Sequence, residues 1–352
     1  MKILYIGLKY DYGQEERGYS FEHYNFYDSL VKMENGRHNV IYFPFDEMLL
    51  TMTQLEMNQK LLEKVEEEKP DLCFFFLFTD EIYTNTIKKI TDSGVLTYNW
   101  FADDHWRWSI FSKYYAPNFS WVSTTDSQAV EKYRNIGYNN VIKTQWACNH
   151  FLYKKSVDNK DYKHEVSFVG ASHGNRKKII AKIVKAGVKI DCYGAGWTKG
   201  RVNQEQMMEI FSSSKINLNL TESSGGINIK NLIKIFISKS QHKLKINSPR
   251  YWLNYARSML AMRRKQIKGR TFEIAGCGGF LISGEADNVG DYYIPDKEIV
   301  LYSNENDLLK KIKYYLTHDV QREEIRIGGY KRTISEHTYE NRFKEIFKQI
   351  GL

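Results

Sequence analysis

Two acidic residues and a histidine stand together at Asp103, Asp104 and His105. A carboxylate or an imidazole can accept the proton of an attacking hydroxyl, so this trio is the candidate for a general base. Trp100 and Trp106 flank it, and flat aromatic faces suit the CH surfaces of a sugar ring. The alternative is that one of the aspartates caps the next helix and that the tryptophans pack in a core.

Three other residues are weaker candidates for proton transfer. Asp11 follows the first expected strand, in a loop. His23 and His173 also fall near strand ends, but each is more often an ordinary polar residue than a base.

A second kind of chemistry, the binding of phosphate, is suggested by FVGASHGNRKK, residues 168–178. A strand ends at Gly170, a loop of small residues follows, and a helix begins near Asn175. Backbone amides at a helix start, together with Arg176, can hold a diphosphate. The alternative is an ordinary strand–loop–helix turn with solvated cations. The segment is neither a GxGxxG nor a Walker sequence.

Two glycine-containing segments could complete such a site. Tyr193 and Gly194 begin YGAGW, where glycine permits close approach of a ligand or simply a tight turn. In GRTFEIAGCGGFLIS, Arg270 can reach a phosphate and Glu273 can accept from ribose hydroxyls. The alternative for Glu273 is stabilisation of the helix N-terminus.

Strand-like and helix-like runs alternate along the chain, which predicts parallel, doubly wound sheets. DLCFFFLF, residues 71–78, is a continuous apolar run, as expected for a strand covered on both faces. The pattern pauses over the polar residues 152–164 and then restarts with EVSFVG. The last stretch, from Val320, is helical, with an expected break at Gly328-Gly329.

Length and composition favour two soluble globular domains: the chain has 352 residues, 42% hydrophobic and 26% charged. Four dispersed cysteines without a CxxC pair argue against a zinc knuckle and suggest a reducing compartment. The N-terminus reads as a strand, not as a signal peptide, and no apolar stretch is long enough to span a membrane. We therefore expect a cytoplasmic protein.

The positive charge is concentrated in one segment. The chain carries a net charge of +9, and residues 227–270 contain twelve Lys/Arg and no Asp or Glu. The remainder has 39 basic and 42 acidic residues. Such a block predicts contact with an anionic membrane surface, binding of a polyanionic acceptor, a source of cations for the donor phosphate, or a solvated basic face with an apolar side. Nucleic acid is disfavoured because no RNA-binding motif accompanies it.

Several ordered motifs resemble the CgeB-like (spore-maturation-protein-type) glycosyltransferases over residues 165–345. They are FVG followed by an arginine, YGAGW, KINLNLT, RTFEIAGCGGFLIS, EIVLYSNENDLLKKIKYYLTHD and HTYENRF. The likeness is weaker over the N-terminal half, where NWFADDHWR matches a Trp/Asp-rich strand end.

The resemblance implies a GT-B fold, that is, two Rossmann-like domains facing a central cleft. It implies a nucleotide diphosphate sugar as donor and no other cofactor. Gly170 and Arg176 would match the phosphate loop, Arg270 would lie near the diphosphate, Glu273 near the ribose, and Asn219 close by. Many retaining GT-B enzymes carry a Glu-x7-Glu motif, whose second glutamate matches Glu273. At the position of the first glutamate, eight residues earlier, this chain has Lys265. The stereochemical outcome is therefore open.

The expected domains are residues 1–151 on the acceptor side, residues 165–330 on the donor side with a basic insert at 227–268, and a C-terminal helix at 331–352. Asp103 and Asp104 are adjacent and do not form the DxD motif of the other glycosyltransferase fold, so no essential metal is expected. The acceptor would be a hydroxyl of a glycan, lipid or protein, with peripheral anionic membrane contact through 227–268. The alternatives are an inactive glycan- or surface-binding module and a sugar-nucleotide epimerase of the same architecture. Replacing Arg270 or Glu273 by alanine should weaken donor binding and leave the fold intact.

Overall fold

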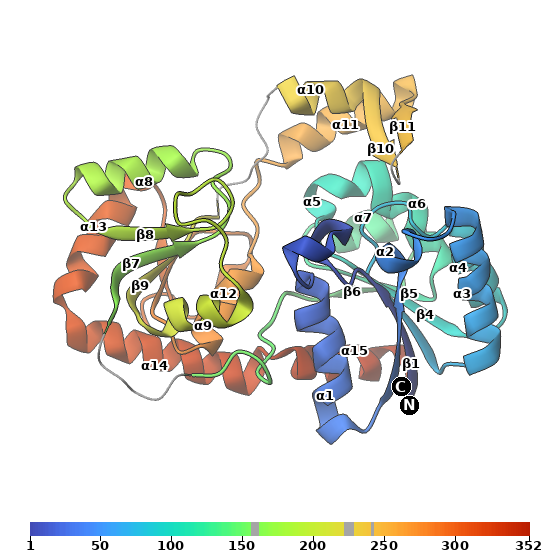
Figure 1. The fold of residues 1–352 in the computed structure, drawn as a ribbon, viewed down its shortest axis with the longest axis horizontal. Helices are drawn as coiled ribbons and strands as arrows, with labels where there is room; N and C mark the ends of the chain where they lie inside the picture. Colours follow the sequence, from blue (N-terminus) through green and yellow to red (C-terminus); the bar gives the residue numbers. More distant parts are fainter. Residues whose placement is uncertain (156–161, 222–228, 241–242) are drawn as a thin grey trace. The chain divides into compact units, whose positions relative to one another are not determined.

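The computed structural model describes residues 1–155, 162–221, 229–240 and 243–352. The chain folds into two compact units. Unit 1 comprises Met1–Gln145, Ile227–Met262 and Arg342–Leu352, and unit 2 comprises Trp146–Gly226 and Arg263–Asn341. Each contains one parallel sheet with helices on both faces (Figure 1), which confirms the doubly wound α/β class.

The sheet of unit 1 has six parallel strands in the order β2-β1-β3-β4-β5-β6. Since parallel strands end at the same edge, the loops that follow β1, β3 and β4 are neighbours there. The strands are β1 (Lys2–Gly7), β2 (Asn39–Pro44), β3 (Leu72–Phe75), β4 (Leu96–Phe101), β5 (Trp121–Thr124) and β6 (Val141–Lys143).

Helices cover both faces of this sheet because its strands are apolar on both sides. One face packs against α3 (Gln54–Glu68), α4 (Thr84–Asp92) and α7 (Ala129–Arg134). On the other face, Phe26 and Phe343 contact Phe74, with ring centroids 6.3 and 5.6 Å apart. Phe26 lies in the π-helical turn His23–Tyr27 before α1 (Asp28–Gly36), and Phe343 lies in α15 (Tyr339–Ile350). Shorter helices are α2 (Phe45–Met48), α5 (Asp104–Arg107) and α6 (Lys113–Tyr115).

Residues 227–262 of the basic segment also belong to unit 1. They contain α10 (Ile229–Phe236), the antiparallel pair β10 (Ile237–Ser240) and β11 (Lys243–Ile246), and α11 (Pro249–Ala261). The Ser258 and Ser109 hydroxyls lie 2.8 Å apart, and Ser109 Oγ donates to the Asn254 carbonyl at 3.3 Å. Whereas the sequence suggested an insert of the second domain, these contacts attach 227–262 to the first.

The sheet of unit 2 has five parallel strands in the order β13-β12-β9-β7-β8. α8 (Arg176–Lys185) and α13 (Glu305–Thr317) cover one face, and α9 (Gln204–Ser212) and α12 (Gly269–Gly276) cover the other. The strands are β7 (His164–Val169), β8 (Ile190–Tyr193), β9 (Ser214–Asn219), β12 (Leu281–Gly284) and β13 (Val300–Tyr302).

The helical end of the chain breaks later than the sequence suggested. α14 (Asp319–Glu336) runs through Gly328 and Gly329 and ends at His337, before α15 begins. A Cβ at either glycine would lie 2.4 Å from the carbonyl oxygen of Lys297 or Glu298. These glycines therefore permit close packing within a continuous helix, and the predicted break is wrong.

Candidate functional site

The carboxyl end of β9 holds the starts of two helices of unit 2 together. Arg176, the first residue of α8, donates from Nη2 to the Leu220 carbonyl at 2.9 Å. Asn219 Nδ2 donates to the Thr271 hydroxyl, in the first turn of α12, at 3.0 Å. The N-termini of α8 and α12 therefore flank one strand end.

Both helices begin in an electrostatically unusual way. Arg176, Lys177 and Lys178 open α8, and Lys268 and Arg270 lie at the start of α12. Cations are unfavourable at a helix N-terminus, where the helix dipole is positive. Within the described structure, neither helix is capped by the side chain of its preceding residue. Together these features favour a bound anion at this edge.

Three other helices of the same chain begin with a side-chain cap. In α3 and α9 the N-cap side chain accepts from the first turn in a complete capping box, and α13 is capped as well. Each has an acidic residue in its first turn. These N-caps are Thr53, Asn203 and Asn304. The cationic, uncapped starts of α8 and α12 therefore differ from the starts of these three helices.

The positive charge of this edge acts on a neighbouring histidine. Desolvation, together with the charges of Arg176 and Lys268, lowers the pKa of His173 to about 4. Its Nε2 lies 3.1 Å from Arg176 Nη1, so the neutral ring accepts a hydrogen bond from the guanidinium. His173 thus marks the positive potential and is not a cation itself at neutral pH.

Arg176 is less accessible than a phosphate ligand would be. Its exposed fraction is 9%, and it donates to the carbonyls of Ala171 and Leu220, both at 2.9 Å. The guanidinium therefore joins the loop after β7 to the end of β9. In this structure, these hydrogen bonds of Arg176 hold the two segments together.

The glycines of the two loops serve close packing between strand ends. Gly194 has φ +125°, and a Cβ there would lie 2.5 Å from the Gly170 carbonyl oxygen. Gly170 also accepts from Trp197 Nε1 at 2.8 Å and donates to the Tyr193 carbonyl at 2.8 Å. YGAGW is therefore the tight turn that the sequence analysis weighed as its simpler interpretation.

Arg270 and Glu273 form an ion pair in α12. The Glu273 side chain is fully buried and also accepts from the Tyr153 hydroxyl at 2.9 Å, whereas the Arg270 side chain is 32% exposed. Glu273 thus lies beneath Arg270 and fixes its direction. The arginine is the member of the pair that solvent reaches.

The candidate bases of unit 1 have separate environments. Asp103 follows β4 and is partly exposed, while Asp104 and His105 are buried. Asp104 Oδ2 accepts from the Tyr133 hydroxyl at 2.8 Å, and burial raises its pKa to about 6. Asp103 does not cap α5 with its side chain within the described structure. Of the three residues, only Asp103 has a partly exposed side chain.

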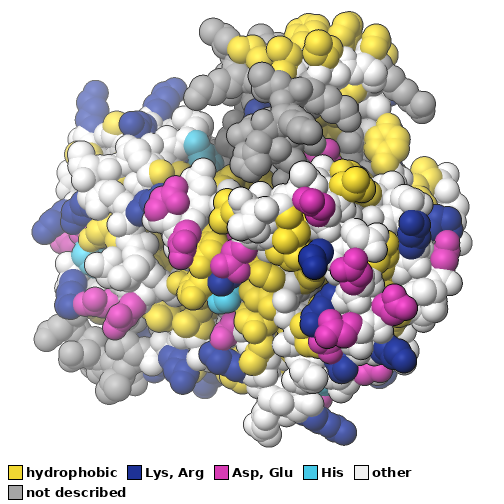
Figure 2. Space-filling view, turned by 45° about the vertical axis from the view of Figure 1, so that its right-hand side comes forward, with side chains coloured by type: hydrophobic (Ala, Val, Ile, Leu, Met, Phe, Trp, Pro, Cys, Tyr) yellow, Lys and Arg dark blue, Asp and Glu magenta, His cyan; other side chains and the backbone are white. Residues whose placement is uncertain are grey.

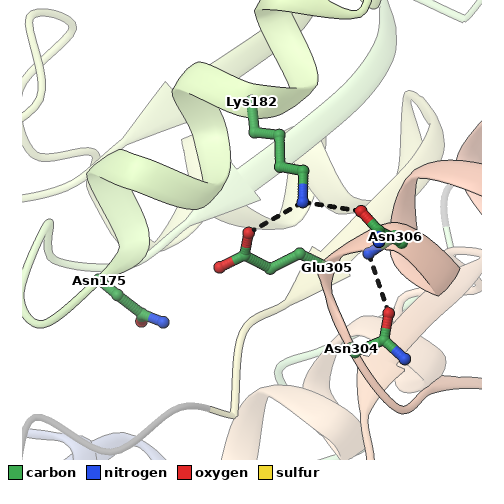
Figure 3. Close-up of a pocket in the computed structure, with 5 residues that line it drawn as sticks. All are labelled: Asn175, Lys182, Asn304, Glu305 and Asn306. Atoms are coloured by element: carbon green, nitrogen blue, oxygen red, sulfur yellow. Dashed lines mark hydrogen bonds and ion pairs between the residues drawn. The ribbon is translucent and has the colours of Figure 1, made fainter.

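A shallow depression extends from the start of α8 to the start of α13 (Figure 3). In it, Lys182 Nζ lies 3.2 Å from Glu305 Oε2 and 2.8 Å from Asn306 Oδ1. This lysine is therefore neutralised locally. The depression adjoins the cationic edge only at Asn175.

Among the described residues, no group of three His, Cys, Asp or Glu side chains could hold a metal ion. In the same ranges, no helix is both long and apolar enough to cross a membrane.

Comparison with known proteins is consistent with this geometry. A family model described as glycosyl transferase-like matches residues 232–348. The spore protein CgeB of Bacillus subtilis (strain 168) is 21% identical over 283 residues, which cover 79% of this chain and 82% of that protein. These two likenesses support a CgeB-like glycosyltransferase.

Solved structures show that the chain has the GT-B fold. The sucrose-phosphate synthase of Thermosynechococcus elongatus is similar with a TM-score of 0.61 at 11% identity, covering 99% of each chain. Anabaena HepE, solved in complex with UDP, gives 0.57 at 9% identity, covering 99% of this chain and 100% of that one. The chain therefore shares the fold of these two proteins.

The sequence analysis did not single out Lys268, one of the cations at this edge. Lys268 immediately precedes α12, and its charge reaches His173. Lys268 is one of twelve Lys and Arg residues in 227–270, and only its position just before GRTFE distinguishes it from the others. A lysine where a helix N-cap is expected was the available signal.

Proposed function

We propose that unit 2 holds the diphosphate of a nucleotide sugar at the starts of α8 and α12. The observation that carries this proposal is the accumulation of cations at two uncapped, positive helix ends beside one strand end. An anion at this edge would receive first-turn amides and side-chain cations together. In the transition state, the same groups would stabilise the departing diphosphate.

The predicted donor residues take different parts in this proposal. Lys268 and Arg270, both partly exposed, contact the diphosphate. Arg176 and Asn219 position the two helix starts, and Glu273 positions Arg270. Glu273 would contact a ribose only if the arginine above it moved.

The loops beside these helix starts complete the proposed donor side. Gly170, Tyr193 and Gly194 bring the ends of β7 and β8 into contact. Their tight approach shapes the backbone next to the diphosphate, and we propose no side-chain chemistry for them.

Donor binding is tested by thermal unfolding with a panel of nucleoside diphosphates and their sugars. A ligand that binds the native state raises the melting temperature by mass action. A charge-assisted hydrogen bond contributes about 1.5–3 kcal/mol, so Lys268→Ala should weaken binding about 10- to 100-fold. Lys313→Ala, which removes an exposed lysine of α13, is the matched control. Equal affinities in both variants would contradict the proposed site.

In unit 1, we propose Asp103 as the general base. The acceptor hydroxyl would lose its proton to Asp103 while its oxygen bonds to the sugar's anomeric carbon and the bond to the diphosphate breaks. Asp103→Asn should lower transfer about 100-fold or more with unchanged donor affinity. Wild-type transfer by this variant would exclude Asp103.

We also propose that transfer needs no metal ion, since helix amides and cations can perform the charge stabilisation. Transfer should then be equal in excess EDTA and in added Mg²⁺ or Mn²⁺. Loss of transfer in EDTA, with recovery on adding a metal ion, would contradict this.

We further propose that the basic segment rests on an anionic membrane surface. Six apolar side chains of 227–262 are at least 40% exposed, and Figure 2 shows hydrophobic side chains gathered over this segment at the top of the view. Exposed apolar side chains together with net positive charge suit an anionic bilayer interface. The six residues are Ile233, Phe236, Ile237, Ile246, Leu253 and Leu260.

Vesicle sedimentation tests the membrane contact. Wild type should bind phosphatidylglycerol-containing vesicles and not pure phosphatidylcholine. Replacing Ile246 and Leu253 by serine should reduce binding, whereas Val320→Ser, an equally exposed position in unit 2, should not. Absence of binding to either vesicle would rule out the contact.

A further inference from the structure

Unit 1 exposes aromatic rings at the edge of its sheet where the strands end. Tyr12 and Tyr19, in the loop after β1, are 62% and 44% exposed, and Phe78, in the loop after β3, is 37% exposed. β1 and β3 are neighbouring strands, so the two loops lie at the same edge. We call these three rings the aromatic platform.

Two rings of the platform contact each other, and the third packs against neighbouring aromatic rings. The rings of Tyr12 and Phe78 meet edge to face, with centroids 5.6 Å apart and an interplanar angle of 87°. Tyr19 is stacked between Tyr10 and His23, with centroid distances of 5.7 and 4.2 Å. The loop therefore presents an organised surface.

The Tyr12 ring is held outward by a costly backbone conformation. Its φ is +56°, a left-handed value that is unusual for a bulky side chain. The Arg17 guanidinium lies 4.5 Å from the ring centroid and pairs with Asp11 Oδ2 at 2.8 Å. Such strain is concentrated at binding sites because the fold must impose it.

The platform is linked to the proposed base through Arg107. Arg107 Nη2 donates to the carbonyl oxygen of Phe78 at 2.8 Å. The backbone amide of Arg107 donates to the Asp103 carbonyl at 2.9 Å. Two consecutive hydrogen bonds thus connect the loop that carries Phe78 to Asp103.

We propose that the aromatic platform binds a sugar ring of the acceptor, so that the acceptor is a carbohydrate. This inference rests on the proposed function, since it takes Asp103 as the base that meets the acceptor hydroxyl. A pyranose has apolar CH faces and a rim of hydroxyl groups. Tyr12, Tyr19 and Phe78 offer ring surfaces, and Asp11 and Arg17 offer hydrogen-bonding groups beside them.

The charged neighbours favour a carbohydrate over an apolar partner. An apolar surface seated on the platform would desolvate Asp11 and Arg17 without giving them new hydrogen bonds. Sugar hydroxyls can replace the water that these groups lose. Aromatic side chains that combine a flat apolar face with a polar group suit such mixed surfaces.

Binding to an array of immobilised oligosaccharides tests the proposal. Wild type should bind a defined subset of the array, and the double variant Tyr12→Ala/Phe78→Ala should bind it about tenfold or more weakly. Tyr12→Phe keeps the ring and should bind as wild type does. Tyr83→Ala, which removes a ring of equal exposure (38%) from the end of the same β3 loop, is the matched control.

Tyr12→Asn separates ring loss from misfolding. Asparagine tolerates the left-handed conformation, so this variant should keep the wild-type melting temperature while losing glycan binding. No binding by wild type, or equal binding by the platform variants, would overturn the proposal. Loss of binding in Tyr83→Ala to the same extent would do so as well.

Nucleotide-sugar thermal shifts, measured on the same samples, keep this failure distinct from that of the proposed function. The platform variants should retain the wild-type shift, because the proposed donor residues all lie in unit 2. If no nucleotide sugar shifts the wild type, the proposed donor site fails whatever the array shows.

Discussion

Replacing Arg270 by alanine should destabilise unit 2. The Glu273 side chain is fully buried. After the substitution it would still accept the hydrogen bond from the Tyr153 hydroxyl at 2.9 Å, but it would lose its ion pair with Arg270. Removing one partner of a buried ion pair costs about 3–5 kcal/mol. Because Arg270 is 32% exposed and water can enter the space it leaves, we expect the lower end, about 3 kcal/mol. In a unit of this size, that corresponds to a fall in melting temperature of about 6–12 °C.

A double-mutant cycle in urea measures this loss. Adding Glu273→Gln to Arg270→Ala should recover about 1–2 kcal/mol, since the buried charge is then absent. Lys163→Ala breaks an exposed pair with Glu209 and should cost less than about 1 kcal/mol. If Arg270→Ala is as stable as the Lys163 control, the carboxylate is not buried as described. Because Arg270→Ala should destabilise unit 2, Arg270→Lys, which keeps the charge, is the better probe of donor binding.

Three further substitutions test local features. Gly194→Ala must displace the Gly170 carbonyl and occupy φ +125°, so it should lose about 2 kcal/mol or more in urea unfolding; an unchanged midpoint would refute the close approach. Gly329→Ala should lower stability similarly, because its Cβ would meet the Glu298 carbonyl at 2.4 Å, and a neutral result would mean that α14 lies farther away. Burial raises the pKa of Asp104 to about 6, above its unfolded value, so this group adds stability as pH falls from about 7 to about 4; Asp104→Asn should lack that gain in urea titrations, and an identical pH profile would contradict the burial.

The sequence predicted the elements well because their signals are local. The apolar run of residues 71–78 became the buried strand β3. Parallel pairing then followed from the regular succession of strands and helices. The GT-B class was implied by the resemblance of several ordered motifs to the CgeB-like glycosyltransferases.

What the sequence did not predict depends on distant partners. Tyr153 and Glu273 are 120 residues apart in the chain, and no local pattern shows that they share a hydrogen bond. The attachment of 227–262 to unit 1 likewise depends on Ser109 and Asn254. Arg176 was predicted as a phosphate ligand from its place at a helix start, but its bonds to Ala171 and Leu220 appear only in three dimensions.

The path of the chain has a consequence for biosynthesis. α15 supplies Phe343 against Phe26 and Phe74, so part of one face of the first sheet stays uncovered until nearly the whole chain has left the ribosome. Domains generally fold as units during translation, N-terminal ones first. Here the first half of the chain exposes an apolar surface, which favours aggregation, while the second unit is synthesised. Truncation before residue 342 should therefore damage the part of the molecule that was synthesised first.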